Sequence, residues 1–192
     1  MRLFLASESP RRHELLKALA EKFTVEAAQV QEVAAESGCP VEELVRTNAV
    51  RKAHAVAALH PEDWVLGADT VVELDGKVYG KPRDLAEAAE VLRTFSGRTH
   101  RVITAIALMN KAQSQQSVIA ETSFVKFREL SDQDIAYYLS QVPVLDKAGS
   151  YGIQEHGELL VEGIEGELEN IIGLPVKALA EEMKKMGISG KF

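Results

Sequence analysis

The sequence of 192 residues contains one cysteine, Cys39, and lacks any apolar run of about 18 residues, the length that spans a bilayer. One cysteine excludes an internal disulfide and a cysteine-based zinc site, which fits a reducing cytoplasm. Because no apolar run is long enough to cross a bilayer, we expect no membrane span. The apolar stretch at the start is too short for a secretory signal, so the expected location is cytoplasmic.

Several familiar motifs are also missing. The sequence has no Walker A pattern and no G-x-G-x-x-G, and its five histidines are scattered without metal-binding spacing. Ser-His-Asp chemistry has no support, and Cys39 is a poor candidate nucleophile because it precedes Pro40 at an expected helix start. No repeat, low-complexity tract or linker interrupts the chain, so we interpret residues 1–192 as a single domain.

The formal net charge of −7 argues against binding to long nucleic acids, which needs a broad basic surface. A small polyanion needs only a local basic pocket. The cations that could form one lie mostly beside glycine, proline or acidic residues: Arg11, Arg12, Lys52, Lys81, Arg83 and Lys147.

Hydrophobic periodicity predicts mixed strands and helices. Strands are expected over 2–6, 23–27, 64–74, 77–79, 99–109, 117–129 and 158–164. Helices are expected over 10–21, from Pro40, from Asp84 to Gly97, from Ser131, and after 173–175. Because Asp75-Gly76 predicts a hairpin, a purely parallel sheet is disfavoured. We expect an α/β fold with a mixed sheet, α+β character and a central cleft.

The first strand leads into Ser9, a good N-cap, and Pro10, which suits the first helical position. Arg11 and Arg12 then oppose the helix dipole, so they are badly placed for helix stability alone. A bound polyphosphate at the helix N-terminus would explain them. A solvated basic turn is the alternative.

Asp69 interrupts the apolar stretch from Gly67 to Val72. A buried carboxylate is costly unless it is paired or bound to metal. It is either a structural hydrogen-bond acceptor, or a Mg²⁺ ligand or a base that activates water. Glu32, in a polar stretch, could supply a second carboxylate.

Two further segments could contact a nucleotide. Gly80–Arg83 places two cations in a rigid turn, and 146–154 ends in Gln154, whose amide offers both a donor and an acceptor for a base. A solvated turn and an ordinary glycine-bearing loop are the alternatives.

Taken together, these segments resemble the Maf family, the septum-formation-inhibitor-like nucleotide pyrophosphatases. The matching motifs run in order along nearly the whole chain: Leu5-Ala6-Ser7-x-Ser9-Pro10-Arg11-Arg12, Lys52-Ala53, Gly67–Val72, Gly80-Lys81-Pro82, Ser96–His100, Asp146–Gln154 and Gly173-Leu174-Pro175. Each motif alone is weak, but seven in order are specific.

The resemblance implies a metal-dependent enzyme (Mg²⁺ or Mn²⁺) that cleaves nucleoside triphosphates between the α- and β-phosphates, on a fold like that of inosine-triphosphate pyrophosphatases. Asp69 matches the proton acceptor, and with Glu32 it would hold the metal. The positions that set base specificity are Arg12, Thr70 and Gln154, a set that resembles the dTTP and UTP subgroup rather than the 7-methyl-GTP subgroup. Other cleft positions are Ser7, Arg11, Lys52 and Lys81. A homodimer stays open.

Some residues depart from the family pattern. Gln31 replaces a common aspartate, and the approach to Lys147 is one residue longer than usual. Glu155-His156 replaces a glycine-containing turn, and 167–169 replaces an aromatic pair. None of these departures touches Asp69, Lys81 or Arg12.

Two other functions stay open. The chain could be a nucleotide-binding regulator of cell division without essential hydrolysis, or an enzyme that clears modified pyrimidine nucleotides. A pure binder has no need of an acid inside an apolar strand, so Asp69 favours an enzyme.

Overall fold

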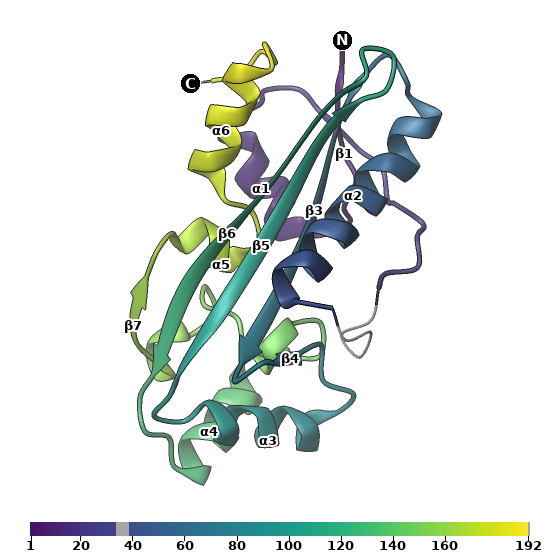
Figure 1. Ribbon diagram of the computed structural model, residues 1–192. Coiled ribbons are helices and arrows are strands. Elements are labelled where there is room, and N and C mark those ends of the chain that lie inside the picture. Colours follow the sequence, from purple (N-terminus) through teal and green to yellow (C-terminus); the bar gives the residue numbers. More distant parts are fainter. Residues whose placement is uncertain (34–38, 192) are drawn as a thin grey trace. The chain divides into compact units, whose positions relative to one another are not determined.

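The computed structural model describes residues 1–33 and 39–191 (Figure 1). The strands are β1 (Leu3–Leu5), β2 (Thr24–Val25), β3 (Trp64–Leu74), β4 (Lys77–Tyr79), β5 (Thr99–Asn110), β6 (Gln115–Phe127) and β7 (Val161–Glu165). The helices are α1 (Pro10–Lys17), α2 (Val41–Leu59), α3 (Leu85–Phe95), α4 (Asp132–Gln141), α5 (Leu168–Ile172) and α6 (Val176–Lys185), with 3₁₀ turns η2 (Ala148–Ser150) and η3 (Gly157–Leu159).

The strands form a mixed sheet in the order β2-β1-β3-β5-β6-β7, and β4 pairs with β3. β1 is parallel to both β2 and β3, whereas the β3–β4 and β6–β7 pairs are antiparallel. Helices and both kinds of strand pairing occur along one chain. The predicted mixed-sheet α/β class is therefore confirmed.

The chain divides into two compact units. Unit 1 comprises Met1–Thr70, Thr104–Glu121 and Gly173–Phe192, and unit 2 comprises Val71–Ile103 and Thr122–Ile172. Each unit has its own apolar core. The single domain with a central cleft stays a prediction.

In unit 1, side chains alternate between the two faces of β3. Leu66 and Ala68 pack in one core with Leu16 of α1 and Leu179 of α6, and these two helices lie side by side in Figure 1. Gly67 instead faces α2, where an added Cβ would lie 2.3 Å from the carbonyl oxygen of Ala49. Only glycine permits this close approach of α2 to β3.

Unit 2 contains a buried aromatic cluster around His100, which is 1% exposed. Its ring stacks on Phe95 at 4.4 Å, and Nε2 lies 2.8 Å from the Tyr151 hydroxyl. Because burial disfavours the charged imidazole, it lowers the pKa of His100 to about 4. The histidine is therefore a neutral part of the core at pH 7.

Local sequence signals were the most accurate predictors of structure. Ser9 and Asp84 cap α1 and α3 as predicted, and Ser131 forms the predicted capping box of α4. Asp75 and Gly76 have φ values of 54° and 80°, as a type I′ turn requires. β3 has the predicted bounds.

Several element boundaries differ from prediction. The first helix ends at Lys17 rather than at 21, and the second strand covers only two residues. The strand predicted over 158–164 begins at Val161, because the preceding residues form η3 and Val161 is the first residue to pair with β6. Helix α5 was not predicted, because its five residues are too few to show helical periodicity. Among the described residues, no helix is both long and apolar enough to span a membrane.

Candidate active site

Asp69 and Thr70 are neighbours on β3 and point to opposite faces of the strand. Asp69 lies two residues after Gly67 and therefore on the same face of β3, where it contacts α2. Thr70 lies on the opposite face and contacts α1. They lie between the part of β3 that pairs with β1 and the part that pairs with β4. Two groups of polar side chains in unit 1 therefore meet at this point of the strand.

The first group is an ionic cluster around Asp69, which is 6% exposed. Lys52 Nζ of α2 lies 2.7 Å from Asp69 Oδ1 and 2.6 Å from Glu32 Oε1. The ammonium thus joins two carboxylates that would otherwise repel one another. The structure brings Asp69, Glu32 and Lys52 together, and it shows that the buried acid is paired.

Asn48 belongs to this cluster, although the sequence analysis did not identify it. Its side-chain Nδ2 lies 3.3 Å from Asp69 Oδ2, and the residue is 3% exposed. Asn48 lies one helical turn before Lys52 on α2, so both side chains project from the same face. The sequence did contain a signal for Asn48, because a polar residue stands at a core-facing position of α2 four residues before Lys52.

The second group surrounds the guanidinium of Arg12. Nε donates to the carbonyl oxygen of Gly173 (2.9 Å), Nη1 to Ser7 Oγ (3.2 Å) and Nη2 to Thr70 Oγ1 (2.9 Å). Thr70 Oγ1 is also 3.0 Å from the hydroxyl of the fully buried Thr104. Each guanidinium nitrogen therefore has a protein acceptor, and each terminal nitrogen carries a second N–H.

The electrostatic setting links the two groups. Burial lowers the pKa of Arg12 from its ordinary value, and the carboxylates of Asp69 and Glu32 oppose this shift. Arginine stays charged in any case. A fixed positive charge thus lies in the field of the two carboxylates. Arg11 is half-buried, and its predicted phosphate contact stays a prediction.

Two predicted site residues, Lys81 and Gln154, belong to unit 2, and both are exposed. The segments that carry them are joined by a backbone hydrogen bond, in which the Gly149 N–H donates to the Gly80 carbonyl (3.1 Å). Their approach to the residues of unit 1 stays a prediction. The structure shows a different contact for Arg83, which donates to Glu87 at 2.8 Å and so helps to begin α3.

Lys147 is buried below the Gln154 segment. Its Nζ lies 2.9 Å from Asp146 Oδ1, 3.2 Å from Glu155 Oε1 and 2.5 Å from the Pro143 carbonyl oxygen. The lysine is thus fully engaged by protein oxygens and not presented to a ligand. Glu155, one of the departures from the family pattern, is part of this support.

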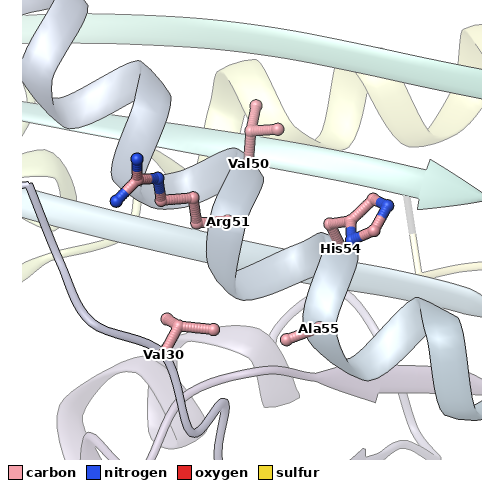
Figure 2. A pocket seen from close by; sticks show the side chains of 5 residues that line it. All are labelled: Val30, Val50, Arg51, His54 and Ala55. Carbon is pink, nitrogen blue, oxygen red and sulfur yellow. The ribbon is translucent and has the colours of Figure 1, made fainter.

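A pocket of about 300 Å³ also lies in unit 1, lined by Val30, Val50, Arg51, His54 and Ala55 (Figure 2). Its lining is mostly apolar, and Figure 2 shows four of these side chains on α2 and one on the preceding segment. None of the predicted site residues lines it. The carboxylates and the arginine, rather than this hollow, define the candidate site.

Two convergent carboxylates are a donor set that suits Mg²⁺ or Mn²⁺, because such ions take one or two carboxylates and complete their shell with water and phosphate oxygens. Among the described residues, no group of three or more histidine, cysteine or acidic side chains is arranged so that it could hold a metal ion. An all-protein metal cage is therefore absent from the described part of the chain. The residues present fit an ion that binds together with a phosphorylated substrate.

The arrangement can therefore bind a phosphate group through Arg12 and place a carboxylate beside it. The chain is similar to known proteins over nearly its whole length. The chain is 43% identical over 96% of its length to the dTTP/UTP pyrophosphatase of Akkermansia muciniphila, covering 96% of that protein. It is 44% identical to the dTTP/UTP pyrophosphatase of Clostridioides difficile, over 96% of this chain and 95% of that protein.

A more distant similarity is to the crystal structure of a nucleoside-triphosphatase, a dITP/XTP pyrophosphatase, from Mycobacterium abscessus. The TM-score is 0.43 at 19% identity, over 66% of this chain and 74% of that one. The family described as Maf-like protein matches residues 2–186, which is nearly the whole sequence. Because this match spans nearly the whole sequence and the two relatives above are 43–44% identical over 96% of it, this chain belongs to the Maf family.

Proposed function

We propose that this protein is a divalent-metal-dependent pyrophosphatase that hydrolyses dTTP and UTP to the monophosphate and pyrophosphate. The relatives that are 42–44% identical over most of the chain are named dTTP/UTP pyrophosphatases. The observation that carries the proposal is the buried Asp69, which Lys52 joins to Glu32. A cytoplasmic location is part of the proposal, because one cysteine suits a reducing compartment.

In the proposed reaction, a water oxygen attacks the α-phosphorus and the bond to the bridging oxygen of the β-phosphate breaks. Asp69 accepts the proton of the attacking water, and pyrophosphate leaves. Arg12 is positioned to donate its remaining N–H groups to the substrate, since protein acceptors already fix its plane. Positioning and charge supply most of the catalysis in reactions of this kind.

Asp69 and Glu32 would hold the divalent ion. When bound, it would neutralise negative charge on the triphosphate, which is the usual contribution of Mg²⁺ to such reactions. Lys52 balances the two carboxylates in their present arrangement and could turn to a phosphate oxygen when they bind a cation.

Base selection is proposed for Gln154 together with Thr70 and Arg12. Uracil and thymine present a carbonyl acceptor beside an N–H donor, and an amide complements both. Because an amide can flip to suit cytosine, Gln154 alone cannot discriminate. Neighbours must fix its orientation, and a site built around a polar group then rejects analogues that lack it.

A panel of nucleoside triphosphates with Mg²⁺ or Mn²⁺, scored for pyrophosphate release, tests the proposal. We expect dTTP and UTP to be cleaved well and CTP poorly. Equal rates on UTP and CTP, or a preference for 7-methyl-GTP, would contradict the subgroup assignment. Nucleotide binding without any pyrophosphate release would instead support a regulatory binder.

A further inference from the structure

Asn48 makes three hydrogen bonds that join two parts of the candidate site. Its Oδ1 accepts from the Val33 backbone N–H (2.8 Å), and its Nδ2 donates to the Val33 carbonyl oxygen (3.3 Å). Nδ2 also donates to Asp69 Oδ2 (3.3 Å). Val33 directly follows Glu32, so one buried side chain contacts both the segment that carries Glu32 and the carboxylate of Asp69.

The pattern of partners determines the orientation of the amide. The Val33 N–H needs an acceptor, whereas the Val33 carbonyl and the Asp69 carboxylate need donors. Only an amide with its oxygen toward the N–H satisfies all three groups. Aspartate, serine and leucine each lack at least one of the required donors or acceptors, so asparagine is specifically suited to this position.

Asn48 and Lys52 divide the two oxygens of Asp69 between them. Lys52 contacts Oδ1 and Asn48 contacts Oδ2, and both side chains come from one face of α2. We propose that Asn48 is a positioning residue that holds the Glu32 segment and the Asp69 carboxylate in one fixed arrangement, whether or not Lys52 is engaged there.

The two contacts respond differently to a ligand. The Lys52 contacts are ionic, so a divalent ion or a phosphate competes with them directly. The contacts of Asn48 with the Val33 backbone carry no net charge and persist when ions exchange. Asn48 therefore keeps the Glu32 segment and the Asp69 carboxylate in position during that exchange. Residues that hydrogen-bond to metal ligands and orient them have this function in other metal sites. This inference rests on the proposed function.

The experiment compares Asn48→Ala and Asn48→Ser with matched changes at Asn110, another buried asparagine of unit 1. Asn110 donates to the Glu62 carbonyl and accepts from the Gln113 N–H, and it contacts no predicted site residue. We measure kcat and KM on dTTP, the Kd for Mn²⁺ alone by calorimetry, and the exchange rate of the Val33 amide in metal-free protein. If Asn48→Ala does not fold, Asn48→Ser supplies the readout.

At position 48 we expect kcat to fall by about 10-fold or more and the Kd for Mn²⁺ to rise by a similar factor, in line with losses of supporting groups. The KM for dTTP should change little, and the Val33 amide should exchange faster. The Asn110 variants should lose stability only. Wild-type kcat and Mn²⁺ affinity in a folded Asn48 variant would overturn the inference. Failure of the wild-type protein to cleave dTTP would instead contradict the proposed function.

Discussion

In unit 1 the side chains of the proposed site residues form hydrogen bonds and ion pairs with one another. In unit 2 the side chains of the proposed site residues are exposed. Lys52 and Asn48 fix both oxygens of Asp69, and three protein oxygens fix Arg12. By contrast, Lys81 and Gln154 are exposed, and the segments that carry them are joined by the hydrogen bond from Gly149 to Gly80.

From this difference we expect the two sets of residues to contribute to different steps, catalysis and substrate binding. Groups that act on the reacting phosphate must keep their geometry, because small displacements cost much of the rate. Exposed side chains, such as those proposed to bind the base and the outer phosphates, have fewer contacts that fix their geometry. Substitutions around Asp69 should therefore affect turnover, Arg12 should tolerate no conservative change, and substitutions in unit 2 should affect affinity and selectivity.

The largest expected effect is that of Asp69→Asn. The amide keeps the shape of the side chain but cannot accept a proton, so turnover on dTTP should fall by at least ~10²-fold in a folded protein. The matched control is Asp63→Asn, a buried carboxylate of unit 1 that binds Arg2. It should lower the melting temperature and leave turnover intact. Near-wild-type turnover in Asp69→Asn would contradict the assigned role.

The second prediction compares two cations. Arg12→Ala and Lys81→Ala should each weaken nucleotide binding by roughly 1.5–3 kcal/mol, the range for hydrogen bonds to charged groups. Arg12→Lys should lose nearly as much as Arg12→Ala, because one ammonium cannot replace three differently directed N–H groups. Lys81→Arg should bind to within about threefold of wild type, because an exposed cation has few geometric constraints.

Calorimetry with dTTP measures all four affinities, and Arg83→Lys is the control for an exposed arginine engaged by Glu87. Unchanged affinity in both alanine variants would show that the phosphate contacts are misplaced. Equal tolerance of Arg12→Lys and Lys81→Arg would contradict the contrast between a fixed and an adaptable cation.

Local chemistry explains how much of this could be predicted from the sequence. Ser9, Asp84 and Ser131 act within a few residues of themselves, so their caps could be identified without knowing the fold. Asp69 could be identified from the sequence because an acid within an apolar strand is costly to bury unless it is paired or bound to metal. Glu32 could be named as a second carboxylate, but the ion pairs of Lys52 with Asp69 and Glu32 became evident only from the structure.

Other features depend on long-range packing. Asn48 bonds to Val33 and Asp69, which are 15 and 21 residues away, and no local pattern encodes that choice. Likewise, Gly67 looks like an ordinary strand glycine until α2 is found against it. The sequence also could not show that Lys147 is engaged by Asp146 and Glu155, because its motif suggests a ligand contact as readily as a buried ion pair.

The third prediction concerns the pH dependence of stability, which His100 should make larger in unit 2 than in unit 1. The pKa of His100 falls from 6.5 to about 4 on folding, so between these values the unfolded chain binds a proton that the folded chain does not. Stability from this residue is complete above pH 6.5 and is lost as the pH falls toward 4. The loss should total about 3 kcal/mol.

Urea unfolding at pH 7 and pH 5 measures this effect, with His100→Gln as the variant that cannot titrate. The pH dependence should be clearly smaller in His100→Gln, whatever its stability at pH 7. Hydrogen exchange at pH 5 should show that unit 2 loses protection before unit 1, because His100 lies in the core of unit 2. The same pH dependence in both proteins would contradict this account.

The smallest expected effect concerns base selection by Gln154. Gln154→Ala removes one exposed amide from unit 2 and leaves Asp69, Glu32 and Arg12 unchanged, so dTTP cleavage should persist. The ratio of kcat/KM for UTP to that for CTP should fall on the order of 10-fold, equivalent to about one hydrogen bond. Gln141→Ala, an exposed glutamine on α4, is the matched control and should not change the ratio. If Gln154→Ala instead abolished turnover on every substrate while the ratio stayed constant, Gln154 would act on the reacting phosphate, and the proposed division between a fixed unit 1 and an adaptable unit 2 would be wrong.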